Sequence, residues 1–373
     1  MAFQVRAEVL REAIARVLPL VPSRSLYPIT QNILLYQQVE DMEVRATDLE
    51  MSLRTWVRVL PEEGDAVRLA LPPKVLLDLL KGFAGDEVLT FRQKDYTLQV
   101  SSHYGHYEFS GFAPEEFPAF PARPEKEGVS FPFSRFTQVV ERTAFAASHE
   151  ETRPVMTGLY FDFEETQTNF VATDSHVLVL VTVPDLRLAG APKLIIPVKA
   201  LKAFQQAIKG LPESDELTLY PSEGQAFFHH PLVEMVCRLI DGQYPSYKAV
   251  IPPNPPYVAR LNTETFQRTL KRLSVLANKK MGLIRLEFVG NVLTARVEDT
   301  EGGLRGEEHL PCEYEGPDFQ IAFRSTILEE VLEHLYAPHF LLRMEAPGRA
   351  ARFEPDPQSP HEEALFLVMP MML

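Results

Sequence analysis

Three acidic residues recur at nearly equal intervals along this chain of 373 residues: Asp48, Asp174 and Asp299. Each follows a predicted strand, and carboxylates are groups that general acid–base catalysis uses, so a catalytic set is the first chemistry to consider. The regular spacing argues against it. We interpret the three as equivalent turn residues of a repeat, and equivalent turns of separate domains lie too far apart to act on one bond.

Other reactive side chains give no stronger signal. The pairs His103–His106 and His229–His230 have spacings found in metal sites, but neither is accompanied by a suitable third ligand. The two cysteines form neither a disulfide framework nor a paired metal-ligand spacing. The GxxxxGKS/T and GxSxG motifs are absent. We therefore predict no catalytic residue, no metal, no cofactor and no ATP hydrolysis by this chain.

Basic residues on predicted helices give the clearest chemical signal. The helix expected over 197–209 places three lysines opposite its apolar stripe and contains no acidic residue. A helix that begins after Thr263 has the same division. Six predicted helical segments together carry a net charge of +8, although the whole chain carries −14. This segregation predicts a surface that attracts phosphates, and the alternative is that exposed helix faces are simply charged.

These residues sit in segments that recur three times in a fixed order. A strand leads into an amphipathic helix, the next strand ends in the acidic turn, and a further strand leads into a second helix. The first strand and helix are expected over 3–18, 131–147 and 258–277, and the last begin at residues 72, 197 and 323. Alternation of apolar and polar residues between them predicts antiparallel sheet. The fold class is therefore α+β, with three repeated domains of two helices packed on antiparallel sheets.

We expect these domains to span 1–123, 128–250 and 257–373, separated by stiff proline-rich linkers. The loop DGQYPSYKAVIP, residues 241–252, has a fainter twin in EFPAFP at 116–121, which also indicates duplication. Its tyrosines are interpreted as packing residues. The apolar share of 45% is typical of a globular protein, and no apolar run approaches a membrane span, so we expect a cytoplasmic protein.

Domain size indicates what the basic faces could surround. A domain of about 125 residues is about 36 Å across. Three in a closed ring leave a hole of about 6 Å, whereas six leave about 36 Å, enough for a DNA duplex about 20 Å wide. One chain supplies three domains, so two chains joined head to tail would close such a ring.

The chain resembles the bacterial DNA polymerase III beta subunit, or beta sliding clamp, family. The resemblance covers all three repeats and is carried by ATDSH at 172–176, by DGQYPSYKAVIP, and by the C-terminal LVMPMML at 367–373. It implies a six-domain ring closed by a head-to-tail homodimer, which encircles duplex DNA without reading its sequence and acts as a processivity factor for the replicative polymerase. Implied partners also include a clamp loader and other polymerases and repair proteins that bind through short peptides.

The resemblance also implies site residues, each at the position that matches the family pattern. The partner-peptide groove would be lined by Met156, Thr173, Ser175, His176, Leu178, Pro245, Val250, Leu367, Met369, Pro370 and Met371. Flexible methionines suit a groove that accepts several partners. Ser175 stands where the family usually has Gly, and Val177, Ala249 and Met372 stand where it often has Arg, so this groove is less basic than is usual in the family.

Two further sets follow from the resemblance and the helix faces. The DNA-binding set comprises Arg24, Lys74, Lys81, Arg153, Lys199, Lys202, Lys209, Lys271 and Arg272. The dimer interface would place Tyr107 and Phe109 of one subunit against Val275 and Leu276 of the other. Two alternatives to the clamp remain from the residues alone: a nucleic-acid-binding scaffold that closes no ring, and a metal-dependent nuclease.

Overall fold

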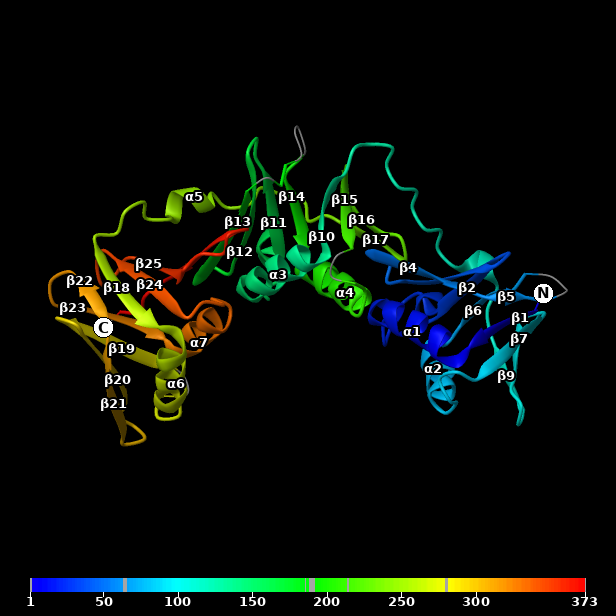
Figure 1. Cartoon of the computed structure of the whole chain (residues 1–373), viewed down its shortest axis with the longest axis horizontal. Helices are drawn as coiled ribbons and strands as arrows, with labels where there is room; N and C mark the ends of the chain where they lie inside the picture. Colours follow the sequence, from blue (N-terminus) through cyan, green and yellow to red (C-terminus); the bar gives the residue numbers. More distant parts are fainter. Residues whose placement is uncertain are drawn as a thin grey trace. The chain divides into compact units, whose positions relative to one another are not determined.

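The computed structural model describes residues 2–62, 66–184, 186–187, 192–212, 215–278 and 281–372. The chain divides into two compact units, one formed by Met1–Phe136 with Lys199–Leu239 and the other by Thr137–Val198 with Ile240–Leu373 (Figure 1). The division passes through the middle repeat, and each unit holds its own sheets and helices. None of the helices in the described ranges is long and apolar enough to cross a membrane.

The first unit contains two antiparallel sheets. The five-stranded sheet has the order β5 (Leu60–Pro61), β1 (Ala2–Arg6), β7 (Val88–Lys94), β8 (Thr97–Ser101) and β9 (His106–Ser110). The eight-stranded sheet has the order β10 (Val129–Pro132), β15 (Glu216–Ser222), β16 (Gln225–His230), β17 (Val233–Arg238), β4 (Met51–Arg58), β3 (Asp41–Thr47), β2 (Ile33–Gln38) and β6 (Arg68–Leu71). Helices α1 (Ala7–Val17) and α2 (Pro73–Lys81) pack against each other, and most of α4 (Val198–Ile208) belongs to this unit (Figure 1).

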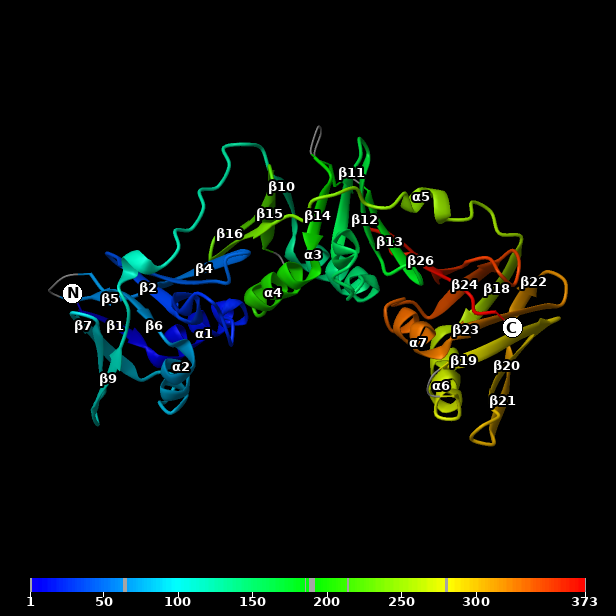
Figure 2. The same cartoon turned by 180° about the vertical axis from the view of Figure 1, so that it is seen from behind.

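The second unit has a nine-stranded and a four-stranded sheet. The larger runs β14 (Leu194–Pro197), β11 (Gly158–Phe163), β12 (Gln167–Thr173), β13 (Val177–Pro184), β26 (Glu363–Val368), β25 (Ala351–Asp356), β24 (His339–Met344), β18 (Tyr257–Asn262) and β22 (Glu313–Glu315). The smaller runs β21 (Leu304–Pro311), β20 (Val292–Asp299), β19 (Leu283–Val289) and β23 (Phe319–Arg324). Helices α6 (Thr263–Ser274) and α7 (Ser325–Glu333) pack side by side (Figure 2), and most of α3 (Phe133–Thr143) belongs here too.

Both large sheets are built from two repeats. In the first unit β17 of the middle repeat pairs with β4 of the first, with Met235 opposite Leu53. In the second unit β13 of the middle repeat pairs with β26 of the third, with Leu178 opposite Leu367. Backbone hydrogen bonds connect strands of neighbouring repeats, so each repeat shares a sheet with the next. The boundary between the two compact units therefore runs through the middle repeat.

Two of the three recurring acidic residues, Asp48 and Asp174, are turn residues, whereas Asp299 is the last residue of β20. Asp48 Oδ1 accepts a hydrogen bond from Met51 N over 2.8 Å, and Asp174 Oδ1 accepts one from Val177 N over 2.8 Å. The residue after each aspartate has a positive φ, 77° at Leu49 and 82° at Ser175. Hydrogen bonds from Asn278 and from the backbone of Gly302 and Glu301 lower the pKa of Asp299. The shared turn hydrogen bonds give Asp48 and Asp174 the same structural role and agree with the predicted repeat.

Helix ends are where sequence and structure differ most. The expected helix over 134–147 is α3 followed by a short 3₁₀ turn at Ala144–Ala146, and the helix expected to reach residue 277 ends at Ser274. At its start the side chain of Asn262 accepts a hydrogen bond from Thr265 N over 2.9 Å, so α6 has a capped N-terminus. Because α6 ends at Ser274, Val275 lies just after the helix, and 77% of its surface is exposed.

A buried ion pair ties α3 to the loop before β26 in the second unit. Arg142 Nη1 lies 2.8 Å from Glu362 Oε1, and the two side chains are only 8% and 4% exposed. The guanidinium also lies over the ring of Tyr336, 5.1 Å from its centroid. Glu362 Oε2 and Arg142 Nε have no hydrogen-bond partner among the described residues, so each buried charge is compensated mainly by the other.

We predict that Glu362→Gln destabilises the second unit by about 3–5 kcal/mol, because it leaves a buried guanidinium without a counter-charge. Urea-induced unfolding followed by circular dichroism measures the change. The matched control is Glu264→Gln, which removes an ion pair to Arg268 whose side chains are about 70% exposed and should cost about 0.5 kcal/mol or less. Equal effects of the two substitutions would contradict the importance assigned to the buried pair.

Candidate functional site

An apolar cluster forms where β13 and β26 meet in the second unit. Leu178 and Leu367 are opposite each other in these strands and are 5% and 4% exposed. Thr173, at the end of β12, lies opposite Leu178 on the other side of β13. Three of the predicted groove residues are therefore brought together by strand register alone, from segments far apart in the sequence.

The loop 241–252 packs its tyrosines against this cluster. The ring of Tyr244 stacks on that of Tyr160 with centroids 4.6 Å apart, and its hydroxyl donates to Val171 O over 3.2 Å. Tyr247 Oη donates to Asp162 Oδ2 over 2.8 Å. Burial raises the pKa of both tyrosines well above the ordinary value, and the charge of Asp162 contributes at Tyr247. Both phenols thus stay protonated hydrogen-bond donors, which confirms the interpretation of these tyrosines as packing residues.

The remaining predicted groove residues lie at the surface around the cluster. Met369 N donates to His176 O over 2.8 Å, and Met371 N donates to Ala322 O over 2.8 Å, so two backbone hydrogen bonds hold the C-terminal segment that contains Pro370. Ser175 Oγ lies 3.8 Å from Met156 Sδ. Pro245 and Val250 lie on the loop that carries the buried tyrosines, and Val250 is 56% exposed. The last residue of the predicted motif, Leu373, lies outside the described residues.

Several members of the cluster were not predicted from the sequence. They are apolar side chains from strands, from the loop and from segments beside the strands, and they comprise Tyr160, Val171, Leu180, Ile195, Leu365, Ala350, Val155, Ile240 and Ile251. Tyr160 and Val171 belong to strands whose residues are almost all buried, so nothing in the sequence marks them as different from core. Ile251 follows Val250 directly and could have been found by asking which side of the loop packs.

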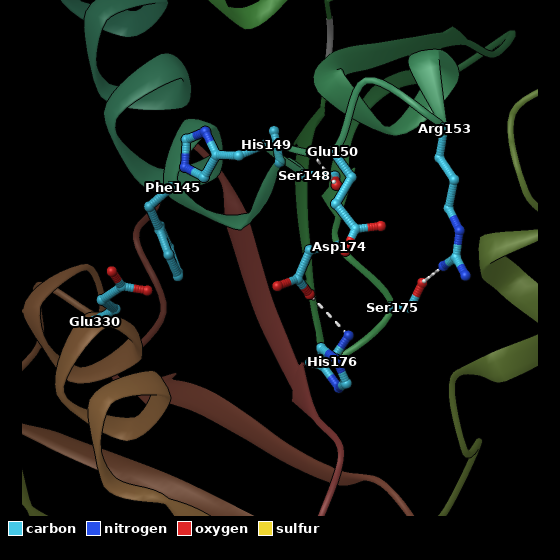
Figure 3. A pocket seen from close by; sticks show the side chains of 10 residues that line it. Phe145, Ser148, His149, Glu150, Arg153, Asp174, Ser175, His176 and Glu330 are labelled. Atoms are coloured by element: carbon cyan, nitrogen blue, oxygen red, sulfur yellow. Dashed lines mark hydrogen bonds between the residues drawn. The ribbon is translucent and has the colours of Figure 1, made fainter. Parts of the chain in front are cut away.

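A polar cavity of about 460 Å³ adjoins the groove residues Ser175 and His176. Its other lining residues come from the end of α3, the 148–153 segment, the turn at Asp174 and helix α7, and they comprise Phe145, Ala147, Ser148, His149, Glu150, Arg153, Asp174 and Glu330. Figure 3 shows Asp174 and Glu330 pointing toward each other, with Phe145 between their elements, whereas Arg153 points toward Ser175. Arg153 Nη1 donates to Ser175 Oγ over 3.0 Å.

All nine predicted DNA-binding residues have exposed side chains, on helices or adjoining loops. Three are neutralised by ion pairs within the chain: Lys81 with Asp78 at 2.9 Å, Lys199 with Asp48 at 2.9 Å, and Arg272 with Glu308 at 2.6 Å. The other six have no carboxylate partner in the described part of the chain. Arg153 is held by Ser175 Oγ, which leaves Arg24, Lys74, Lys202, Lys209 and Lys271. These five are the stronger candidates for phosphate contacts, and the whole set stays a prediction.

The predicted dimer residues lie at open sheet edges. β9, which carries Tyr107 and Phe109, is the last strand of the five-stranded sheet, and β21 is the last strand of the four-stranded sheet. A Cβ at Gly306 in β21 would come within 2.8 Å of Leu276 Cδ1, so the segment after α6 lies directly against this edge strand. Tyr107 and Phe109 therefore lie on an edge strand, and the segment with Val275 and Leu276 lies next to one.

The histidine pairs have local partners. His106 Nδ1 lies 2.9 Å from Ser101 Oγ, His229 Nδ1 lies 2.7 Å from Glu234 Oε1, and His230 Nε2 lies 2.9 Å from Asp215 Oδ2. Within the described ranges no three His, Cys, Asp or Glu side chains are gathered so that they could hold a metal ion. These contacts account for the histidines as structural residues.

We predict that Tyr247→Phe lowers the unfolding free energy by about 1–3 kcal/mol and increases amide exchange across 241–252, because Asp162 is only 3% exposed and loses its phenol donor. Chemical unfolding and hydrogen–deuterium exchange measure the two effects. Tyr104→Phe is the control, since Tyr104 is 87% exposed. Unchanged exchange in this loop would show that the hydrogen bond does not anchor it.

Three family models match the chain in order. They describe the N-terminal, central and C-terminal domains of the DNA polymerase III beta subunit, over residues 1–121, 130–246 and 248–371. The beta sliding clamp of Synechococcus elongatus is 28% identical over 88% of this chain and 89% of its own length, and that of Pseudomonas putida is 23% identical over the full length of both.

Solved structures agree in fold. The crystal structure of the DNA polymerase III subunit beta from Pseudomonas aeruginosa matches with a TM-score of 0.93 at 22% identity, covering all of both chains. The Bacillus subtilis sliding clamp matches with a TM-score of 0.92 at 22% identity, over 100% of this chain and 99% of its own. A Pseudomonas aeruginosa clamp, 21% identical, has also been solved bound to griselimycin. Since the family models together span nearly the whole chain, this protein belongs to the DNA polymerase III beta subunit family, the beta sliding clamps.

Proposed function

We propose that this chain is a DNA polymerase processivity factor, a sliding clamp that encircles duplex DNA and tethers the polymerase. The observation that carries this function is the ordered match of three clamp-domain models along the chain. The chain itself acts as a binding protein and not as a catalyst, which is supported by the structural turn roles of Asp48 and Asp174. It acts in the cytoplasm, where DNA replication takes place in bacteria.

The ring is closed by a second copy of the chain joined head to tail. One unit ends at the open edge of β9 and the other at the open edge of β21. Unpaired strand edges recruit another strand, and the exposed Val275 beside β21 gives this edge an apolar component. Because the two edges differ, the contact is heterologous, and two copies supply the six domains that a ring around DNA needs.

Duplex DNA is held without base readout. Five of the six exposed cations that have no carboxylate partner among the described residues, Arg153 being the sixth, are distributed over α2, α4, α6 and two loops, as expected for contacts to a continuous phosphate backbone. The net charge of −14 disfavours tight binding elsewhere on the surface. This combination permits sliding, since long-range attraction is weak and no base is recognised.

Partners bind by a short peptide at the groove residues around the apolar cluster. The cluster supplies a buried apolar floor, and the exposed Met369 and Val250 supply adaptable walls. The partners are the replicative polymerase, the clamp loader, and other polymerases and repair proteins. Griselimycin, with which a Pseudomonas aeruginosa clamp has been solved, is a compound to test for competition with partner peptides.

A topological experiment tests the ring. After a clamp loader has assembled the protein on nicked circular DNA, it should stay bound through gel filtration in high salt and be released when the circle is cut. A ring leaves by sliding off an end, whereas electrostatic binding depends on salt and is indifferent to ends. Retention that is unaffected by linearisation would favour the alternative, a nucleic-acid-binding scaffold that closes no ring.

Groove variants test the tether. Deleting Met369–Leu373, or introducing Val250→Asp at an exposed position, should abolish stimulation of the polymerase, because a charge or a missing wall disrupts the apolar contact. Sedimentation should show that the dimer persists in both. Leu60→Asp, at another exposed apolar residue, is the control and should stimulate normally. Stimulation that survives both groove changes would refute the assigned groove.

A further inference from the structure

We propose that the polar cavity beside the groove binds a cationic side chain, arginine or lysine, of the partner peptide, so that partners of this clamp carry a basic residue next to their apolar residues. The inference rests on the proposed peptide groove. It adds a subsite with its own chemistry, formed by Phe145, Asp174 and Glu330.

The cavity shares two residues with the predicted groove. Ser175 and His176 line the cavity and belong to the predicted groove, and Met369 is hydrogen-bonded to His176 through the backbone. A peptide that covers Met369 therefore has only to continue past His176 to reach the cavity. With a volume of about 460 Å³, the cavity holds one long side chain easily.

Charge in the cavity favours a cation. Its lining has three carboxylates, at Glu150, Asp174 and Glu330, against the single guanidinium of Arg153. Arg153 is directed to Ser175, and Figure 3 shows it on the side of the turn away from Glu330. Within the described residues none of the three carboxylates forms an ion pair. Burial, followed by the charges of Asp174 and Glu333, raises the pKa of Glu330, although His334 and His149 oppose the shift.

The placement of the carboxylates favours a cationic side chain as the occupant of the cavity. Asp174 and Glu330 point toward each other from different elements (Figure 3), so a cation in the cavity would be attracted to both. Asp174 Oδ1 is already used by the backbone of His176 and Val177, which fixes this carboxylate in place and leaves Oδ2 for a ligand. The partly exposed ring of Phe145 lines the same space, and because its face is stacked on His334, with centroids 4.3 Å apart, it contributes an apolar wall.

Other occupants fit less well. A DNA phosphate would be repelled by three carboxylates, and an acidic peptide for the same reason. A metal ion lacks a gathered set of three ligands in the described ranges. The remaining occupant with complementary charge and a tethered approach along the groove is a basic peptide side chain.

Peptide display on the whole native protein tests the proposal. Random dodecapeptides are selected on the wild type, and those whose binding is lost with Val250→Asp are kept as groove binders. We expect arginine or lysine to be enriched at one fixed position relative to the apolar residues. Synthetic peptides with Arg, Lys or Glu at that position then distinguish the two cations and measure the charge dependence by fluorescence anisotropy.

Matched charge reversals locate the contact. Glu330→Lys should weaken the arginine peptide about tenfold or more and should favour the glutamate peptide. Glu333→Lys, an exposed carboxylate on α7 that does not line this cavity, should change either affinity less than about twofold, as expected for a screened surface charge. No enrichment of basic residues, or equal effects at both positions, would overturn the cation subsite alone. Selected peptides that all tolerate Val250→Asp would instead contradict the groove and with it the proposed function.

Discussion

The pairing of β13 with β26 is the interaction on which the site depends. It joins residues 177–182 to residues 363–368 by backbone hydrogen bonds, and so makes one sheet from two repeats. Its register places Leu178 opposite Leu367; a shift of one residue would turn each strand's apolar set to the other face. The same pairing brings the C-terminal segment next to the turn at His176, where Met369 forms its backbone hydrogen bond. A groove built this way requires no additional domain, because its floor is the continuous sheet.

Electrostatics in this chain is largely local. Lys81, Lys199 and Arg272 have exposed side chains and lie where basic helix faces are expected, yet each is compensated by a carboxylate of its own unit. Exposed pairs of this kind contribute little to stability, but each one cancels a positive charge that would otherwise attract phosphates at long range. The phosphate-attracting surface therefore depends on fewer cations than the helix faces suggest. Weak, distributed attraction suits a protein that must move along DNA, since a dense basic surface would hold it in place.

The fold was predictable because the repeat is encoded by local sequence signals for turns and helices. The turns at Asp48 and Asp174 each need a carboxylate acceptor followed by a residue with positive φ, and each helix needs an apolar stripe, so these signals recur along the chain. The cross-repeat pairing was not predictable from the residues, because every strand is apolar enough to pair with several others. The ion pairs of Lys199 and Arg272 were missed for the same reason, since their partners Asp48 and Glu308 are 151 and 36 residues away in the sequence.

Ser175 shows how resemblance and structure combine. Its φ of 82° lies in the left-handed region, where a side chain costs energy and glycine does not. The hydroxyl gives a compensating interaction, because it accepts a hydrogen bond from Arg153 and approaches Met156 Sδ. That contact holds the one guanidinium of the neighbouring cavity away from Glu330 (Figure 3). Ser175 is unfavourable for the backbone, but it keeps the guanidinium away and so leaves the carboxylates of the cavity uncompensated. This departure from the family pattern therefore affects the charge of the surface to which partners bind.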